Sequence, residues 1–385
     1  MRIGAKIALT ADLLRARFAF RRRGHDPHNV LVIRLDGFGD FSLYLPYALA
    51  LREICPAGKY KLTLCANANW CEVAEKLLPF DGFIPLDVRR YMTEMAYRKD
   101  ANRRIASGGY GTVLQPRFFR EPLLEDRLAL AAGADGGVAF AVGDAHLHAA
   151  CGRKLEKRLY DRRLPCLADR HEALKNRIFM DALGEWREPP RPELPPPLPE
   201  WAPGSYIVLL PGSGKGERAA WPPERWGRAL AGAELCCAVA GTAAEAPLVF
   251  AAAKSVGERA VPLAGTLSAW DFARLVANAR FVVGNDTGGI HFAAWCGVPA
   301  LAVTGGGHPG WYYPYPAEAM PDHVRAPHSE AYPMPCCGCA WKCTKRKFGT
   351  FPCIAAVTPA AVASKIAALS NQLLSGVSSA LPPAR

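Results

Sequence analysis

The sequence predicts an α/β protein made of two doubly wound domains. Short apolar runs alternate with helix-length stretches over most of the 385 residues, and polar glycine-rich turns follow several of those runs. A segment dense in proline, residues 188–204, interrupts this alternation once. Because proline at such density favours an extended connector over packed structure, we expect a linker there with one domain on each side.

We therefore expect five segments along the chain. They are a basic amphipathic segment (1–28), a first Rossmann-like domain (29–187), the linker (188–204), a second Rossmann-like domain (205–358) with a cysteine-rich insert (328–353), and a C-terminal helix and tail (359–385).

The composition limits the classes of partner and location. The formal net charge is +12, so an acidic partner is expected: nucleic acid, a phosphorylated substrate or an anionic membrane surface. No apolar run reaches transmembrane length. The first residues carry no cleavable signal pattern, and a reducing cytoplasm is the expected compartment.

The N-terminal segment combines apolar and arginine-rich positions. The residues able to share one helical face are Ile3, Ile7, Leu13, Leu14 and Phe18, and the run Arg21–Arg23 supplies charge. Such a helix can lie on an anionic membrane. The alternative is a solvated helix, or one docked on the core ahead of the first strand.

The first domain is expected to open with a strand at Val30–Leu35, a glycine turn and a helix reaching about Ile54. This arrangement places Asp36 and Asp40 at the carboxyl edge of the strand, where α/β folds usually bind ligands. The third glycine of a dinucleotide fingerprint is absent, which disfavours nicotinamide binding. Asp40 could alternatively be only a helix cap.

A basic stretch follows later in the first domain, at residues 144–170, and includes Arg153 and Lys154. We interpret it as a clamp for an anionic acceptor. A solvated helix face is the alternative.

The second domain begins again with a strand at Tyr206–Leu210 and the loop Gly212–Gly216. The loop lacks the spacing of a Walker A motif. The residues here that suit a diphosphate are Ser213, Lys215 and Arg218. At the next carboxyl edge, Glu245 is a candidate acceptor for ribose hydroxyls.

The stretch Phe281–Thr304 predicts strand, turn, helix and strand. Its turn residues are Asn285, Asp286, Thr287, Gly288 and Gly289. Amides at a helix N-terminus suit a phosphate, and glycines allow close approach to the backbone. An aspartate or threonine that merely caps the helix is the alternative.

Five of the thirteen cysteines crowd one short segment. They are Cys336, Cys337, Cys339, Cys343 and Cys353. Three interpretations stay open: a structural metal site, a redox-labile disulfide cluster, or reduced thiols in a loop.

Four blocks of sequence resemble glycosyltransferase family 9, the heptosyltransferases of bacterial lipopolysaccharide core assembly and their relatives. The blocks are Val30–Asp40, Val208–Ser213 with Trp221–Trp226, Gly241–Glu245, and Gly284–Ala294 with Gly297–Pro299. They occur in the family's order across both halves of the chain.

The resemblance implies a GT-B fold, in which two Rossmann-like domains face each other across a cleft and the last helix crosses back to the first domain. It further implies that the N-terminal domain binds the acceptor and the C-terminal domain binds a nucleotide-sugar donor. Transfer would invert the anomeric centre without a metal. The family's base matches Asp40, and its donor-binding acid matches Asp286, with Thr287, Gly288 and His291 near the phosphates.

The resemblance makes ADP-heptose the default donor and a glycolipid on an anionic membrane surface the default acceptor, with no nucleic-acid partner. The expected location is the cytoplasmic face of the membrane. Two other functions stay open: a nucleotide-sugar epimerase on the same fold, and a non-catalytic binding module that holds a metal. The chain departs from the family at Ala219 and Ala220, where members often carry lysine, and at Gly307–Pro309.

Overall fold

The computed structural model describes residues 10–16, 21–142, 149–165, 169–188, 193–345 and 349–377. The chain divides into two compact units, Met1–Pro190 and Arg191–Arg385. None of the helices in the described ranges has both the length and the apolar character that crossing a membrane requires.

The first unit is built on a six-stranded sheet in the spatial order β3-β2-β1-β4-β5-β6. Its strands are β1 (Asn29–Arg34), β2 (Lys61–Asn67), β3 (Gly82–Leu86), β4 (Thr112–Gln115), β5 (Gly136–Phe140) and β6 (Arg162–Leu164). All neighbouring strands pair in parallel. This is a doubly wound order, and its connections diverge between β1 and β4.

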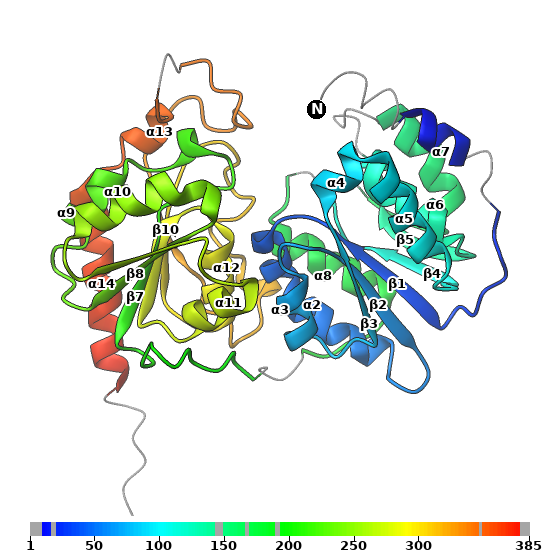
Figure 1. Ribbon diagram of the computed structural model, residues 1–385, viewed down its shortest axis with the longest axis horizontal. Helices are drawn as coiled ribbons and strands as arrows, with labels where there is room; N and C mark the ends of the chain where they lie inside the picture. The colour runs from blue at the N-terminus through cyan, green and yellow to red at the C-terminus, as the bar shows by residue number, and fades with distance from the viewer. Residues whose placement is uncertain are drawn as a thin grey trace, which may run out of the picture. The chain divides into compact units, whose positions relative to one another are not determined.

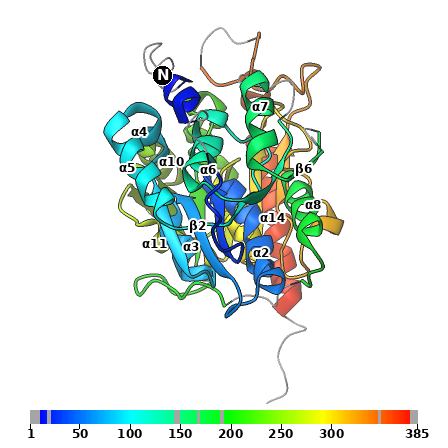
Figure 2. The same ribbon diagram turned by 90° about the vertical axis from the view of Figure 1, so that its right-hand side faces the viewer.

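The helices of the first unit cover both faces of that sheet (Figure 1). They are α2 (Phe38–Ile54), α3 (Cys71–Leu77), α4 (Val88–Thr93), α5 (Met95–Ala106), the π-helical turn η1 (Pro122–Asp126), α6 (Arg127–Ala132), α7 (Ala149–Leu159) and α8 (Glu172–Leu183). On one face, Leu31 and Ile33 of β1 share a core with Ile105 of α5 and Leu128 of α6. Helices α2 and α8 pack against each other away from that core (Figure 2).

The second unit repeats the same architecture with the order β12-β11-β10-β7-β8-β9. Its strands are β7 (Tyr206–Leu210), β8 (Cys236–Gly241), β9 (Ala260–Ala264), β10 (Phe281–Asn285), β11 (Ala300–Thr304) and β12 (His328–Ala331). If β7 is counted as the first strand and the order is read from β9 to β12, the second sheet has the same strand order as the first. All neighbouring strands again pair in parallel. The connections therefore diverge between β7 and β10.

Helices of the second unit also lie on both faces of the sheet (Figure 1). They are the 3₁₀ turns η2 (Glu217–Ala219), η3 (Pro223–Arg225), η4 (Ala243–Glu245) and η5 (Ala317–Ala319), and the helices α9 (Trp226–Ala229), α10 (Ala246–Val256), α11 (Ala269–Ala277), α12 (Gly288–Trp295), α13 (Pro352–Ala355) and α14 (Pro359–Val377). The core on one face joins Leu209 and Val283 to Trp226, Val249 and Val362. Helices α11 and α12 pack together outside that core.

The described part of the N-terminal segment is docked on the first unit. Residues 10–16 are helical, and Leu13 is buried in the core beside β1. The Asp12 carboxylate lies 3.0 Å from Arg127 and 3.5 Å from Arg98. Here the core-docked alternative is correct, whereas Ile3, Ile7 and Phe18 lie outside the described residues.

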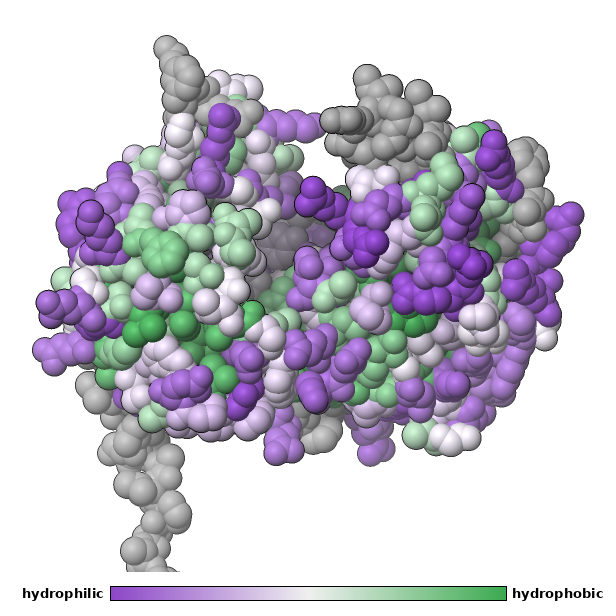
Figure 3. All heavy atoms as spheres, in the orientation of Figure 1, coloured by the Kyte–Doolittle hydropathy of each residue, from purple (hydrophilic) through white to green (hydrophobic). Residues whose placement is uncertain are grey.

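The basic character of the chain is visible on the solvent side of α5. Lys99, Arg103 and Arg104 are exposed there, and the surface of this helix is strongly hydrophilic (Figure 3). Asp100 lies 3.5 Å from each of the two arginines. Since such exposed pairs contribute little to stability, this face is best described as solvated.

Candidate functional site

Two groups of polar residues lie where the connections of the two sheets diverge. In the first unit, Asp36 and Asp40 follow β1. In the second unit, the loop 211–216 follows β7, Asn285 ends β10 and Asp286 follows it. Ligands of doubly wound folds bind outside the carboxyl ends of the strands at such points. Each unit therefore has one candidate site.

The first site is a cluster of three carboxylates. Asp36, Asp40 and Glu172 each offer an oxygen, and these oxygens lie within 4.8 Å of one another. Asp36 and Glu172 are buried, while Asp40 is half-buried in the first turn of α2. Because like charges this close repel, the cluster needs positive charge to stay folded.

Arg34, at the end of β1, supplies that charge. Its guanidinium is fully buried and lies 2.8 Å from Asp36 and 3.2 Å from Glu172. It also donates to the backbone carbonyl of Asp40 at 3.2 Å and to the side-chain oxygen of Asn176 at 3.0 Å. Four acceptors on three elements are thus held by one side chain.

The electrostatics of the cluster place a proton within it near neutral pH. Burial raises the pKa of Asp36 to about 7, with Arg34 opposing the shift and the negative charge of Asp40 and Glu172 adding to it. Asp36 is thus half protonated near neutrality, beside a second carboxylate, Asp40, that is open to solvent. A neutral and a charged carboxyl side by side can bind a hydroxyl and accept its proton.

Backbone contacts fix the loop that carries these carboxylates. The Asn67 side chain donates to the carbonyls of Leu35 and Asp36, and the Trp70 indole also donates to Asp36 at 2.9 Å. Trp70 in turn stacks on Phe41 of α2 with ring centroids 4.0 Å apart. The loop after β1 is therefore held rigidly on its sheet.

The two other predicted acceptor residues are on a different element. Arg153 and Lys154 are exposed on α7, which packs against η1. The carboxylate cluster is built instead from the loop after β1, from α2 and from α8. That Arg153 and Lys154 act together with Asp36 on one acceptor therefore stays a prediction.

The second site is a pocket of about 370 Å³ in the second unit. Lys215 and Asp286 line it, together with the loop after β11 and the aromatic residues Tyr312 and Tyr313. The volume lies within the usual range of small-molecule sites, and the mixture of aromatic rings with a few charged groups is typical of them.

Asn285 holds the two loops that border this pocket. Its side chain is fully buried, accepts from the backbone amide of Trp221 at 2.9 Å and donates to the carbonyl of Pro211 at 2.7 Å. One amide thereby fixes the start of the loop after β7 against the end of β10. The sequence motif contains Asn285, but its positioning role became visible only in the fold.

Asp286 begins a chain of buried polar groups. Its carboxylate lies 3.7 Å from His291 Nε2, and His291 Nδ1 is 2.6 Å from the hydroxyl of Tyr315. Burial raises the pKa of Tyr313 and of Tyr315 well above the ordinary value, with Asp286 adding to both shifts. His291 is therefore behind Asp286, where it can orient the carboxylate, and it does not line the pocket.

The start of α12 combines one open donor with one packing constraint. The buried hydroxyl of Thr287 has no hydrogen-bond partner among the described residues. A Cβ at Gly289 would come within 2.5 Å of Leu210 and 2.8 Å of Phe272, so this glycine is required by packing within the unit. Thr287 and Gly288 remain candidates for binding an anion at the helix N-terminus.

The remaining predicted donor residues have mainly local roles in the structure. Glu245 forms a capping box with Thr242: its carboxylate accepts from the Thr242 amide at 2.9 Å and from the Thr242 hydroxyl at 2.8 Å. The Glu245 carboxylate also leaves no room for a Cβ at Gly212. Ser213 accepts from the amide of Lys215 at 3.3 Å. Arg218 is exposed on η2.

The cysteine-rich segment borders the same pocket. Cys337 and Trp341 line it, and both also line a much smaller cavity of about 10 Å³. The other four predicted metal ligands line that smaller cavity as well. They are Cys336, Cys339, Cys343 and Cys353.

Several site residues were not singled out from the sequence. They are Arg34, Glu172, Lys175 and Asn176 in the first site and Tyr313 and Tyr315 in the second. One signal was available for Arg34, since a charge inside an otherwise apolar strand needs a buried partner. The other residues are far from their partners in sequence.

Comparison with known proteins agrees with this arrangement. Residues 188–338 match the family model of glycosyltransferase family 9 (heptosyltransferase). Among curated proteins, none matches the sequence.

Solved structures share the fold at low identity. A family 9 glycosyl transferase from Veillonella parvula has a TM-score of 0.65 and 16% identity, covering 92% of this chain and 99% of its own. The E. coli heptosyltransferase WaaC with ADP has a TM-score of 0.63 and 17% identity, covering 89% and 99%. The dodecameric iron-containing heptosyltransferase TibC with ADP-D-β-D-heptose has a TM-score of 0.52 and 13% identity, covering 92% and 78%.

The two parallel six-stranded sheets, the structural relatives and the family model together confirm the predicted fold and the family resemblance. The chain has the GT-B fold of these glycosyltransferase structures, and its residues 188–338 match glycosyltransferase family 9 (heptosyltransferase).

Proposed function

We propose that this protein transfers a sugar from a nucleotide-diphosphate donor, by default ADP-heptose, to a hydroxyl group of a lipopolysaccharide-type or other glycolipid. The observation that carries the proposal is that each sheet has polar residues at its point of divergence: a carboxylate cluster in one unit and a charged, aromatic pocket in the other.

Support for the donor comes from the second unit. Solved relatives of the same fold contain ADP or an ADP-heptose analogue. In this chain the proposed ligands of the diphosphate are Lys215, Thr287 and the amides at the start of α12, while Asp286 would orient the donor. Ser213, Arg218 and Glu245 would contribute from the neighbouring loops. A cation and free amides are the groups that stabilise a leaving diphosphate.

Support for the reaction comes from the first unit. The acceptor oxygen would form a bond to the anomeric carbon while the bond from that carbon to the phosphate oxygen breaks. Asp40 would take the proton of the acceptor hydroxyl, and the nucleoside diphosphate would leave with the bonding electrons. Attack from the side opposite the leaving group inverts the anomeric centre. Asp36 is proposed to bind the acceptor beside Asp40.

No metal is proposed for the transfer step. The charge that a cation would supply at the carboxylate cluster is already present on Arg34 and Lys175, which lie 3.2 and 3.4 Å from Glu172. On the donor side, Lys215 lines the pocket. Arg153 and Lys154 are proposed to meet the anionic part of the acceptor.

The location is also a proposal. The arginine-rich N-terminal segment would bring the enzyme to an anionic bilayer on the cytoplasmic face, where a glycolipid acceptor can be reached. Sedimentation with vesicles that contain anionic lipid tests this, with vesicles of neutral lipid as the control. Equal sedimentation with both would contradict it.

The function is tested with a panel of nucleotide-diphosphate sugars. Binding of ADP or ADP-heptose should raise the melting temperature more than UDP, GDP or their sugars do, because a ligand that binds the native state stabilises it. Turnover is then followed with lipid A-core acceptors. Release of nucleotide at the same rate without acceptor would favour the epimerase alternative.

A further inference from the structure

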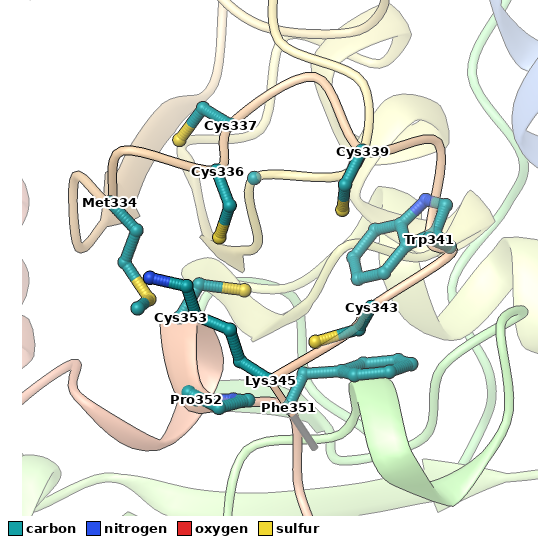
Figure 4. A pocket seen from close by; sticks show the side chains of 11 residues that line it. Met334, Cys336, Cys337, Cys339, Trp341, Cys343, Lys345, Phe351, Pro352 and Cys353 are labelled. Atoms are coloured by element: carbon teal, nitrogen blue, oxygen red, sulfur yellow. The ribbon is translucent and has the colours of Figure 1, made fainter.

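Four cysteine side chains converge on one small hollow in the second unit. Cys336, Cys339, Cys343 and Cys353 come from different parts of an irregular segment and of α13, and their sulfurs are turned inward (Figure 4). The sulfur of Cys337 is turned away from this ring (Figure 4). All five are free thiols.

The size and ligand set of the hollow suit one ion. Its volume is about 10 Å³, which is room for a single atom. Four thiolates around one point form the tetrahedral set that zinc and iron prefer. In the described part of the chain, no three of these sulfurs all lie within 4.8 Å of one another. A tetrahedral site needs S–S separations of about 3.8 Å, so binding requires the four sulfurs to move closer together.

The spacing of the cysteines also matches such a site. Cys336 and Cys339 are separated by two residues, the spacing of a zinc knuckle, and Gly338 between them has the positive φ of 89° that the tight turn requires. The amides of Gly306 and Ile354 hydrogen-bond to the sulfur of Cys353. Amide donors of this kind orient and stabilise a metal-bound thiolate.

The irregular segment around the hollow contains strained residues and no regular secondary structure. Ala340 and Trp341 have φ of 48° and 62°, a left-handed conformation that costs about 1–2 kcal/mol per residue without glycine. Residues 332–345 contain no helix or strand. A short irregular segment with strained backbone persists only when its surroundings hold it in place.

We propose that Cys336, Cys339, Cys343 and Cys353 bind one thiolate-preferring divalent ion, zinc or iron, as a structural centre. Cys337 is not a ligand. The centre ties the cysteine segment to the loop after β11, whose Gly306 and Gly307 accept from the amides of Gly338 and Ala340 at 2.8 Å. It thereby fixes Cys337 and Trp341 in the wall of the larger pocket.

The same packing explains why the loop after β11 is made of glycines. A Cβ at Gly307 would come within 2.2 Å of Trp341, and one at Gly306 within 2.8 Å of the Cys337 sulfur. The cysteine segment therefore occupies space that larger side chains would need at these positions. The glycine at position 307, where the chain departs from the family pattern, is therefore explained by its packing against the cysteine segment.

The first test is the metal content of the full-length protein purified under reducing conditions. We expect about one zinc or iron atom per chain by elemental analysis. Visible absorption separates the two metals, because a four-thiolate iron centre is coloured and a zinc centre is not. Replacing Cys339 or Cys353 by serine should reduce the metal content to background, whereas the matched variant Cys337→Ser should retain it.

A second measurement covers the case in which the ligand variants fail to fold. The wild-type protein, stripped of metal and titrated with Co²⁺, should develop the intense visible bands of tetrahedral cobalt with one ion per chain. Thiol titration should then show four fewer reactive cysteines with Co²⁺ than without it, and Cys337 should stay reactive in both states. The absence of cobalt bands, or two disulfides among the four cysteines in the non-reduced protein, would overturn the proposal. None of these readouts depends on transferase activity.

Discussion

The guanidinium of Arg34 and the carboxylate of Asp36 form a buried ion pair, with Nε 2.8 Å from Oδ2 and 3.0 Å from Oδ1. The pair is formed between residues only two positions apart, where β1 ends and the connection to α2 begins. Arg34 also contacts Glu172 and the backbone of Asp40. It thereby joins the first strand of the first unit to α8, the last helix of that unit.

Replacing Arg34 by methionine should destabilise the first unit by about 3–5 kcal/mol, because uncompensated buried carboxylates would remain. Urea unfolding of the full-length protein measures this loss. The matched control is Arg22→Ala, which removes an exposed pair with Asp161 at 2.9 Å and should cost less than about 1 kcal/mol. Similar losses for both variants would show that Arg34 is not the organising charge.

Asp36 should make the stability of the protein depend on pH. Its pKa in the fold is about 7, above the ordinary 3.8, so the folded state binds more protons than the unfolded state between these values. The stability that this group contributes is fully present below about pH 4 and is lost as the pH rises through 7. Unfolding at several pH values should show this decline in the wild type and a shallower one in Asp36→Asn. Identical slopes would argue against a raised pKa.

Substitution of the proposed base, Asp40→Asn, should reduce turnover by about 10²–10⁴-fold. Nucleotide binding should not change, because the candidate donor pocket is formed by the other unit. Glu53→Gln, which alters an exposed carboxylate on the same helix, is the control for turnover. Full activity of Asp40→Asn would remove this residue from the mechanism.

Asn285→Ala should both destabilise the second unit and weaken nucleotide binding. The amide of Trp221 and the carbonyl of Pro211 would lose their buried partner, at a cost of about 1–3 kcal/mol each. Urea unfolding and ADP-induced thermal shifts measure the two effects. Asn69→Ala, at an exposed position, should change neither. A variant with lower stability but unchanged ADP affinity would limit Asn285 to a structural role.

Gly307→Ala should destabilise the protein by about 1–3 kcal/mol, because its Cβ would overlap the Trp341 ring. Gly232→Ala adds a Cβ into open space and should be nearly neutral. Unfolding in urea compares the two. If the centre proposed above fixes Trp341, metal content should fall in Gly307→Ala alone.

The sequence predicted the central strands better than those at the edges. Val30–Leu35 and Phe281–Val283 are apolar throughout because parallel strands are buried on both faces. Strands β6, β9 and β12 were not predicted, and each lies at the edge of its sheet. Edge strands tolerate charge and proline, which Arg162 of β6 and Pro262 of β9 illustrate.

The candidate sites were predicted in part, for a similar reason. Asp36, Asp40, Lys215 and Asp286 follow apolar strands and were therefore expected at carboxyl edges. Their partners come from distant segments: Glu172 is 138 residues from Arg34, and local patterns carry no signal for such a contact. The spacing of Cys336 and Cys339 was present in the sequence, but the intervening Cys337 obscured which four thiols belong together.

The two sheets share one strand order, and each brings its polar residues together from its own half of the chain. Under the proposed function, mutations that alter recognition of the leaving nucleotide would fall in one half, and those that alter recognition of the recipient hydroxyl would fall in the other. Natural selection can then change one preference without disturbing the other. Such modularity would let chains of this architecture acquire new sugar linkages by recombining halves.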